Sequence, residues 1–178
     1  MKSEKPLMSS GMPGLDRVLQ GLLPGDNVVW EVEDVADYAP VLPPFAAEAR
    51  RLGRRLVYFR FARHEPLLEA GCGAEIHVLH PQEGFERFLT GILDIIESVG
   101  PGAFYVFDCL SDLAADWYSD RMLGNFFMIA CPYLYELDTL AYFALLKSQH
   151  SFQAIHAIVQ TAQVIIEVYR TDSRLYIH

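Results

Sequence analysis

The chain has 178 residues and a mass of 20.1 kDa, which fits one domain large enough to bury a hydrophobic core. Hydrophobic side chains make up 52% of it, so disordered, collagen-like and low-complexity classes are excluded. With 14 basic against 23 acidic residues the formal net charge is −9. Such a surface repels a phosphate backbone, so we expect no nucleic-acid partner.

Cysteine usage and the amino-terminal sequence indicate a compartment. Three cysteines, none of them in a C-x-x-C pair, are typical of a reducing environment. The start, Met1-Lys-Ser-Glu-Lys-Pro6, carries no apolar signal core, and no apolar stretch approaches the roughly 20 residues that span a bilayer. The sequence therefore predicts a cytoplasmic protein without a membrane partner.

Strand-like and helix-like segments alternate along the chain. The β-type apolar runs predict strands at 28–32, 56–61, 75–80, 103–108 and 140–146, and a closing hairpin formed by 164–169 and 174–177. The helical patterns cover 44–53, 85–99, about 119–131 and 151–162.

Three local signals refine these boundaries. The apolar residues from Phe85 to Ile96 recur at three- and four-residue steps, which makes this the clearest amphipathic helix. Pro132 is expected to kink or end the helix that precedes it. The strand 103–108 shows no polar alternation, as expected for a strand covered on both faces.

Strands separated by helices at this spacing predict βαβ units, and so an α/β fold with a mostly parallel sheet and a mixed edge at the hairpin. We see no internal repeat or linker, so residues 1–178 are expected to form a single domain. The last segment is strand-like with no tail after it, and we expect the natural polypeptide to continue past His178.

The amino-terminal motifs resemble those of a known family. Ser10-Gly-Met-Pro-Gly-Leu-Asp16 and Gly21-Leu-Leu-Pro-Gly25, followed by the strand 28–32, are similar to the start of KaiC-like ATPase domains of the RecA superfamily. The later elements agree in order over most of the chain. The resemblance implies a three-layer domain of the P-loop NTPase type, with a mostly parallel sheet and a carboxyl-terminal hairpin.

The phosphate loop that the resemblance implies is degenerate. A working loop reads G-x-x-x-x-G-K-[ST], in which the lysine reaches the phosphates and the hydroxyl binds magnesium. Tyr38 stands at the lysine position and Ala39 at the hydroxyl position. The remaining positions of the degenerate loop, three of them acidic, are Val32, Glu33, Asp34, Val35 and Asp37.

This degenerate loop opposes nucleotide binding and hydrolysis. At about 5 Å and an effective dielectric near 20, each contact between an acid and a phosphate would cost roughly 3 kcal/mol. Where the family places an acidic pair to polarise the attacking water, this chain has Ala62-Arg63. The sequence thus favours a non-hydrolysing pseudo-ATPase domain without a cofactor or catalytic residues. An acidic loop that is merely a solvated connection remains an equal interpretation.

A possible ligand crevice lies where strands are expected to end. Asp108 ends the fourth strand, at the position where the family holds magnesium, and is either a ligand-binding group or a relic that caps a nearby segment. Arg60 and Arg63 end the second strand; they could hold a small anion or pair with Glu31, Glu33 and Asp34. We expect one of these arginines to contact a loop carboxylate, with Tyr38 at least half buried.

Other chemistry-bearing residues form no recognisable constellation. His77 and His80 point to opposite faces of an extended segment, and His150 and His156 lack the i, i+4 spacing of a helical metal pair. No metal site is therefore expected, and no G-x-S-x-G element or catalytic dyad is apparent. Cys109 and Cys131 are expected to be small buried residues.

The aromatic segment 126–135 has two interpretations: part of the core, or a contact surface of a homo-oligomer. The sequence favours a structural or regulatory module that contacts copies of itself or other domains of the same polypeptide. The alternative is a small-molecule or anion-binding amino-terminal domain of a multidomain phosphotransfer enzyme similar to phosphoenolpyruvate synthase and pyruvate phosphate dikinase.

Overall fold

The computed structural model describes residues 6–178, so residues 1–5, with most of the segment examined for a signal peptide, lie outside the described part. It is an α/β structure built on a seven-stranded sheet of order β3-β2-β4-β5-β1-β6-β7. The strands are β1 (Asn27–Val32), β2 (Leu56–Arg60), β3 (Ala74–Val78), β4 (Phe104–Cys109), β5 (Leu140–Leu146), β6 (Val164–Thr171) and β7 (Arg174–Ile177). Neighbouring strands are parallel except β6 and β7, which form an antiparallel hairpin.

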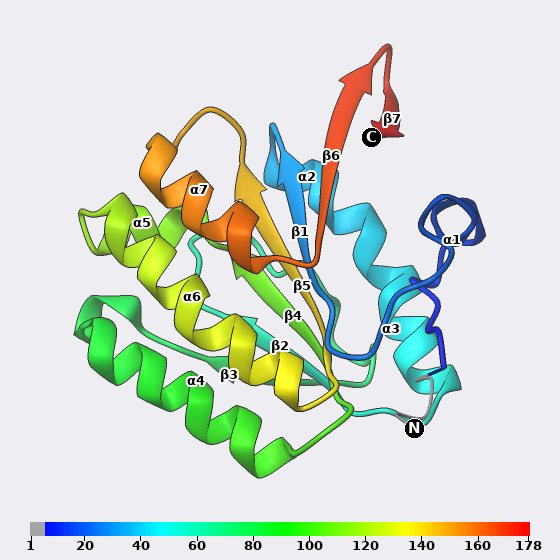
Figure 1. The fold of residues 1–178 in the computed structure, drawn as a ribbon, viewed down its shortest axis with the longest axis horizontal. Coiled ribbons are helices and arrows are strands. Elements are labelled where there is room, and N and C mark those ends of the chain that lie inside the picture. Colours follow the sequence, from blue (N-terminus) through cyan, green and yellow to red (C-terminus); the bar gives the residue numbers. More distant parts are fainter. Residues whose placement is uncertain (1–5) are drawn as a thin grey trace.

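Helices cover both faces of the sheet, which gives three layers (Figure 1). The helices of seven or more residues are α1 (Pro13–Leu19), α3 (Leu42–Arg51), α4 (Phe85–Val99), α6 (Asp120–Glu136) and α7 (Phe152–Thr161). Shorter helices are α2 (Val35–Tyr38), η1 (Ala39–Val41), η2 (Pro81–Glu83) and α5 (Ser111–Asp116). One core lies between the sheet and α1 and α3, and the other between the sheet and α4 to α7.

The predicted α/β class, the mostly parallel sheet and the closing hairpin are confirmed. All six residues of β4 are buried, as its lack of polar alternation predicted. Ser151 caps α7 by accepting a hydrogen bond from the backbone N–H of Ala154. The strands and helices predicted from periodicity begin or end within a few residues of the observed ones.

Of the two outcomes predicted for Pro132, a helix end is wrong, because α6 continues to Glu136. A proline removes one N–H donor, so the carbonyl four residues earlier loses its helical partner. That residue is Met128, which is 45% exposed, so solvent can reach this turn of the helix and hydrate the carbonyl.

The aromatic segment 126–135 divides between core and surface in α6. Phe126 and Phe127 are fully buried, and Phe127 packs edge-on against Phe143 of β5. Met128, Ile129 and Tyr135 are about half exposed on the outer side. The helical period therefore assigns the phenylalanines to the core and leaves only these three large apolar residues for a contact.

Residues 9–16, which include the amino-terminal motif, pack closely against α3 at Gly11; we call this contact the Gly11 clasp. Gly11 has φ +82°, and a Cβ at this position would lie 2.2 Å from the carbonyl oxygen of Pro44. The backbone N–H of Ser10 donates to Asp16 Oδ1 at 2.7 Å, and the hydroxyls of Ser9 and Ser10 bind the same carboxylate. Glycine is required here by the left-handed backbone and by the close approach to α3.

Within residues 6–178, no helix combines the length and apolar character that crossing a bilayer requires.

Candidate functional site

The carboxyl ends of β1, β2, β4 and β5 meet at one edge of the sheet, where open α/β sheets bind ligands. Segment 32–39, in which the resemblance places the phosphate loop, leaves this edge from β1. Only Glu33 and Asp34 separate β1 from α2. Asp34 accepts a hydrogen bond from the backbone N–H of Ala36 at 2.7 Å, so the chain enters a helix at once instead of curling into a phosphate-binding nest.

The side chain of Tyr38 packs into the protein interior beside segment 32–39. This side chain is fully buried, and its hydroxyl donates to the backbone carbonyl of Phe107 at 3.4 Å. Because β5 lies between β1 and β4, the ring reaches across the edge of the sheet to contact β4. Burial raises the pKa of Tyr38 well above its ordinary value, so the phenol is neutral. The predicted burial of Tyr38 is confirmed.

The predicted contact between Arg60 or Arg63 and a loop carboxylate is wrong. Asp37 is almost fully buried, and its ion-pair partner is Arg170 of β6, whose Nε lies 2.9 Å from Asp37 Oδ1. The strand order explains the difference, because β6 is adjacent to β1 whereas β2 stands three places away, roughly 14 Å at 4.8 Å per strand. Glu33 and Asp34 are exposed to solvent.

The two arginines instead bind groups near the end of β2. The Nη2 of Arg60 donates to the carbonyl of His64 at 3.0 Å, while its Nη1 is buried and has no hydrogen-bond partner among the described residues. Arg63 forms an ion pair at 2.5 Å with Asp116, the last residue of α5, and its backbone N–H donates to Asp112 of the same helix. The structure therefore separates Arg63 from the crevice that the sequence predicted.

Asp108 is completely buried and surrounded by donors from the β2 segment. It accepts hydrogen bonds from the Tyr58 hydroxyl and from the backbone N–H groups of Phe61 at 2.9 Å and Ala62 at 3.0 Å. Burial, and then the Asp108 charge, raise the pKa of Tyr58. Asp108 thus anchors the loop that follows β2, which agrees with the interpretation of a capping carboxylate.

A separate charged group lies on β1 and β6. Burial and the neighbouring Glu167 raise the pKa of Glu31. Lys147 donates to the carbonyl of Val168 at 2.8 Å and lies 3.6 Å from the centre of the Tyr169 ring. Glu31 therefore belongs to the sheet surface near β6 and does not face Arg60 or Arg63, in contrast to the pairing that the sequence allowed.

Sequence reasoning missed one set of residues at this edge. Ser111 Oγ lies 2.7 Å from His150 Nε2, and His150 Nδ1 lies 2.9 Å from Asp120 Oδ1. Ser111 follows β4, His150 follows β5 and Asp120 begins α6. The pairing of β4 with β5 brings Ser111 and His150 together, and Asp120 meets them from the start of α6. No spacing motif connects the three residues, so the sequence carried no signal for them.

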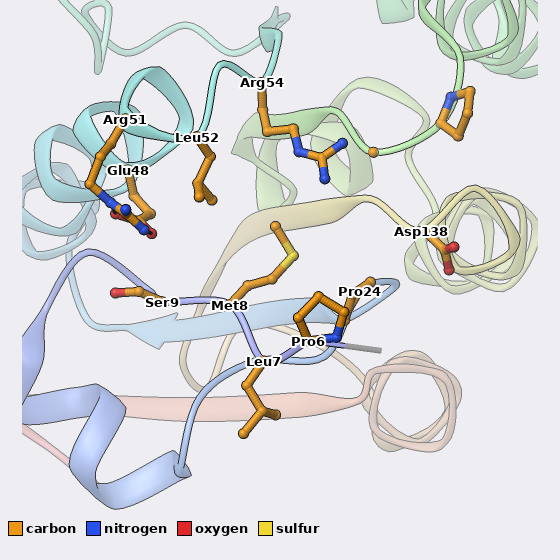
Figure 2. A pocket seen from close by; sticks show the side chains of 12 residues that line it. Pro6, Leu7, Met8, Ser9, Pro24, Glu48, Arg51, Leu52, Arg54 and Asp138 are labelled. Atoms are coloured by element: carbon orange, nitrogen blue, oxygen red, sulfur yellow. Dashed lines mark hydrogen bonds and ion pairs between the residues drawn. The ribbon is translucent and has the colours of Figure 1, made fainter. Parts of the chain in front are cut away.

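The pocket drawn in Figure 2 lies at the opposite, amino-terminal edge of the sheet. It has a volume of about 410 Å³, and its wall includes Pro24, Arg54, Pro101 and Asp138, which precede four of the strands. Within residues 6–178, no group of three or more His, Cys, Asp or Glu side chains is placed to hold a metal ion.

No family model matches the chain, and no curated protein is significantly similar to it.

Proposed function

We propose that this chain is a degenerate RecA/KaiC-like domain that neither binds nor hydrolyses ATP and serves as a structural or regulatory interaction module. The observation that carries the proposal is the buried ring of Tyr38. The ring occupies the space beside segment 32–39 that a phosphate loop would leave for nucleotide. The Gly11 clasp of the amino-terminal signature and the α/β topology support the kinship, and the missing lysine and hydroxyl support the loss of activity.

Two further observations support the loss of nucleotide chemistry. Asp108, at the position of a magnesium-binding carboxylate, already accepts three hydrogen bonds within the protein. Asp37 and Arg170 form an ion pair beside Tyr38, so an entering phosphate would have to separate these charges.

We expect Mg-ATP titrated into the protein to give no binding heat up to millimolar nucleotide. The physical reason is that neither the lysine nor an open cradle of N–H groups is present to offset the cost of bringing phosphate near Glu33 and Asp34. Isothermal titration calorimetry measures this, with Mg-ADP as a parallel ligand. A dissociation constant in the low micromolar range would contradict the proposed loss of nucleotide binding.

The proposed interaction role predicts self-association through the outer side of α6. Met128, Ile129 and Tyr135 leave large apolar surfaces half exposed there. Sedimentation velocity at tens of micromolar protein should detect species larger than the 20.1 kDa chain, and Met128→Glu should shift them toward the monomer. Val18→Glu, at a 79% exposed position on α1, is the matched control. If the unmodified protein is a monomer, the proposed homo-oligomer is wrong, and the interaction role would require contacts with other domains of the same polypeptide.

A second candidate function is the binding of a small anion, and it is favoured by the buried guanidinium nitrogen of Arg60 that donates no hydrogen bond to the described residues. Alternation along β2 puts Arg60 on the same face as Tyr58, and its Nη1 is buried without a partner among residues 6–178. A small anion bound there would satisfy this donor, as expected for the ligand-binding amino-terminal domain of a phosphoenolpyruvate synthase-like enzyme. Saturable heat on titration with inorganic phosphate, lost in Arg60→Ala, would support this candidate.

A further inference from the structure

Ser111, His150 and Asp120 form a series of hydrogen bonds. Their order and direction are those expected of a nucleophile, a base and an orienting carboxylate. The backbone N–H of Leu146 donates to Ser111 Oγ at 2.9 Å, which leaves the hydroxyl proton to be donated by Ser111. At 2.7 Å the His150 Nε2 is placed to accept it. With His150 Nδ1 facing a carboxylate, the role of a base requires the tautomer that carries the proton on Nδ1 and the lone pair on Nε2.

Asp120 is held in the state and position that this role requires. Its Oδ2 accepts a hydrogen bond from the backbone N–H of Ser151 at 2.7 Å, while its Oδ1 faces His150. The hydrogen bond from His150 keeps the pKa of the Asp120 carboxyl below its ordinary value, so this side chain is ionised at neutral pH. The side chain of His150 is 2% exposed, which shields the imidazole from competing water, whereas the Asp120 side chain is 30% exposed.

Ser111 is better suited than the neighbouring Cys109 to be the nucleophile. Cys109 lies two residues earlier and is buried, and burial raises the pKa of its thiol to about 11, so the thiol stays protonated at neutral pH. Ser111, by contrast, has a base in hydrogen-bond reach, and that base has an orienting group, which is the arrangement that activates a hydroxyl.

The surroundings indicate the class of substrate. Ser111 is 7% exposed, so only a small reacting group can approach it. Two large aromatic side chains, Tyr118 at 95% and Phe152 at 80% exposure, each stand two residues from a member of the series, within about 7 Å along the backbone. Tyr118 precedes Asp120 and Phe152 follows His150, so these rings lie near the carboxylate and the imidazole in the chain. The limited exposure of Ser111 favours a short acyl ester as the substrate.

We propose that Ser111 is the nucleophile, His150 the general base and Asp120 the orienting carboxylate of a site that hydrolyses small esters. Ser111 Oγ bonds to the ester carbonyl carbon while its proton passes to His150 Nε2. The bond to the alcohol oxygen breaks, and the departing alkoxide takes that proton. Water, deprotonated by His150, then cleaves the seryl ester, which releases the carboxylic acid and restores Ser111. The site is independent of the proposed loss of ATP binding.

The test uses the full chain, with diisopropyl fluorophosphate as the covalent probe and p-nitrophenyl acetate as the substrate. We expect one diisopropylphosphoryl group, mapped by mass spectrometry to the peptide that contains Ser111, and no labelling in urea, where the geometry is lost. Asp120→Asn, which disturbs the tautomer, should slow both reactions by about 10²- to 10⁴-fold, and His150→Gln should abolish them.

Ser98→Ala is the matched control, because Ser98 is an exposed serine on α4 whose hydroxyl binds only a carbonyl of its own helix. It should retain the reactivity of the unmodified protein. If the site variants lose the circular dichroism spectrum of the native protein, the position of the diisopropylphosphoryl label in the unmodified chain decides the test by itself. Labelling that avoids Ser111, or ester hydrolysis that is unchanged in folded Ser111→Ala, would overturn the proposal and leave the series with the structural role of joining the loop after β5 to α5 and α6.

Discussion

Replacing Asp108 with alanine is expected to lower the free energy of unfolding by about 3–5 kcal/mol. Asp108 is completely buried at the end of β4 and accepts hydrogen bonds from Tyr58, Phe61 and Ala62. Its removal leaves two backbone N–H groups and a phenol without an acceptor in a place that water does not reach. Urea unfolding followed by circular dichroism measures the change.

Two further variants separate this effect from a simple loss of charge. Asp108→Asn keeps one carbonyl oxygen and should cost less than Asp108→Ala, although its amide group cannot accept from all the same donors. Asp94→Ala, at an exposed position of α4, should remain within about 0.5 kcal/mol of the unmodified protein. If Asp108→Ala were as stable as Asp94→Ala, Asp108 would not anchor the loop after β2.

Truncation of Tyr38 to alanine is expected to cost about 3–5 kcal/mol of unfolding free energy. The ring is fully buried among residues of the core that joins the sheet to α3, so its loss opens a cavity where a phosphate loop would stand. Tyr38→Phe keeps the ring and loses only a hydrogen bond of 3.4 Å to Phe107, and should cost about 1 kcal/mol or less. Denaturant midpoints of the two variants, measured side by side, provide the comparison.

The same pair of variants tests whether the closed segment depends on packing or on the hydroxyl. Equal destabilisation in Tyr38→Phe and Tyr38→Ala would contradict a role for ring volume and point to the hydroxyl contact with β4. Little effect in either variant would mean that the ring does not fill the segment, and would weaken the central support for a pseudo-ATPase. Val18→Ala, on the exposed side of α1, provides a reference for an apolar truncation without burial.

The α/β class, the predicted strands and the amphipathic α4 followed from the sequence because each depends on residues close together in the chain. Periodicity reports burial on one face, and apolar runs without alternation report burial on both, as in β4. The burial of Tyr38 was also predictable, since a large ring that replaces the lysine of a phosphate loop can occupy the space otherwise left for phosphate. Pro132 was not, because a proline is tolerated when the carbonyl it leaves unpaired can be hydrated.

The sequence by itself determined the types of element and the chemistry absent from segment 32–39, since both are local properties. The tertiary structure alone decided which charges meet. Strand order is a long-range property: it placed Arg170 of β6 within reach of Asp37, which follows the adjacent strand β1, and left Arg60 and Arg63 at the end of β2, three strands away. The same long-range pairing brought together Ser111, Asp120 and His150, which are separated by up to 39 residues in the chain.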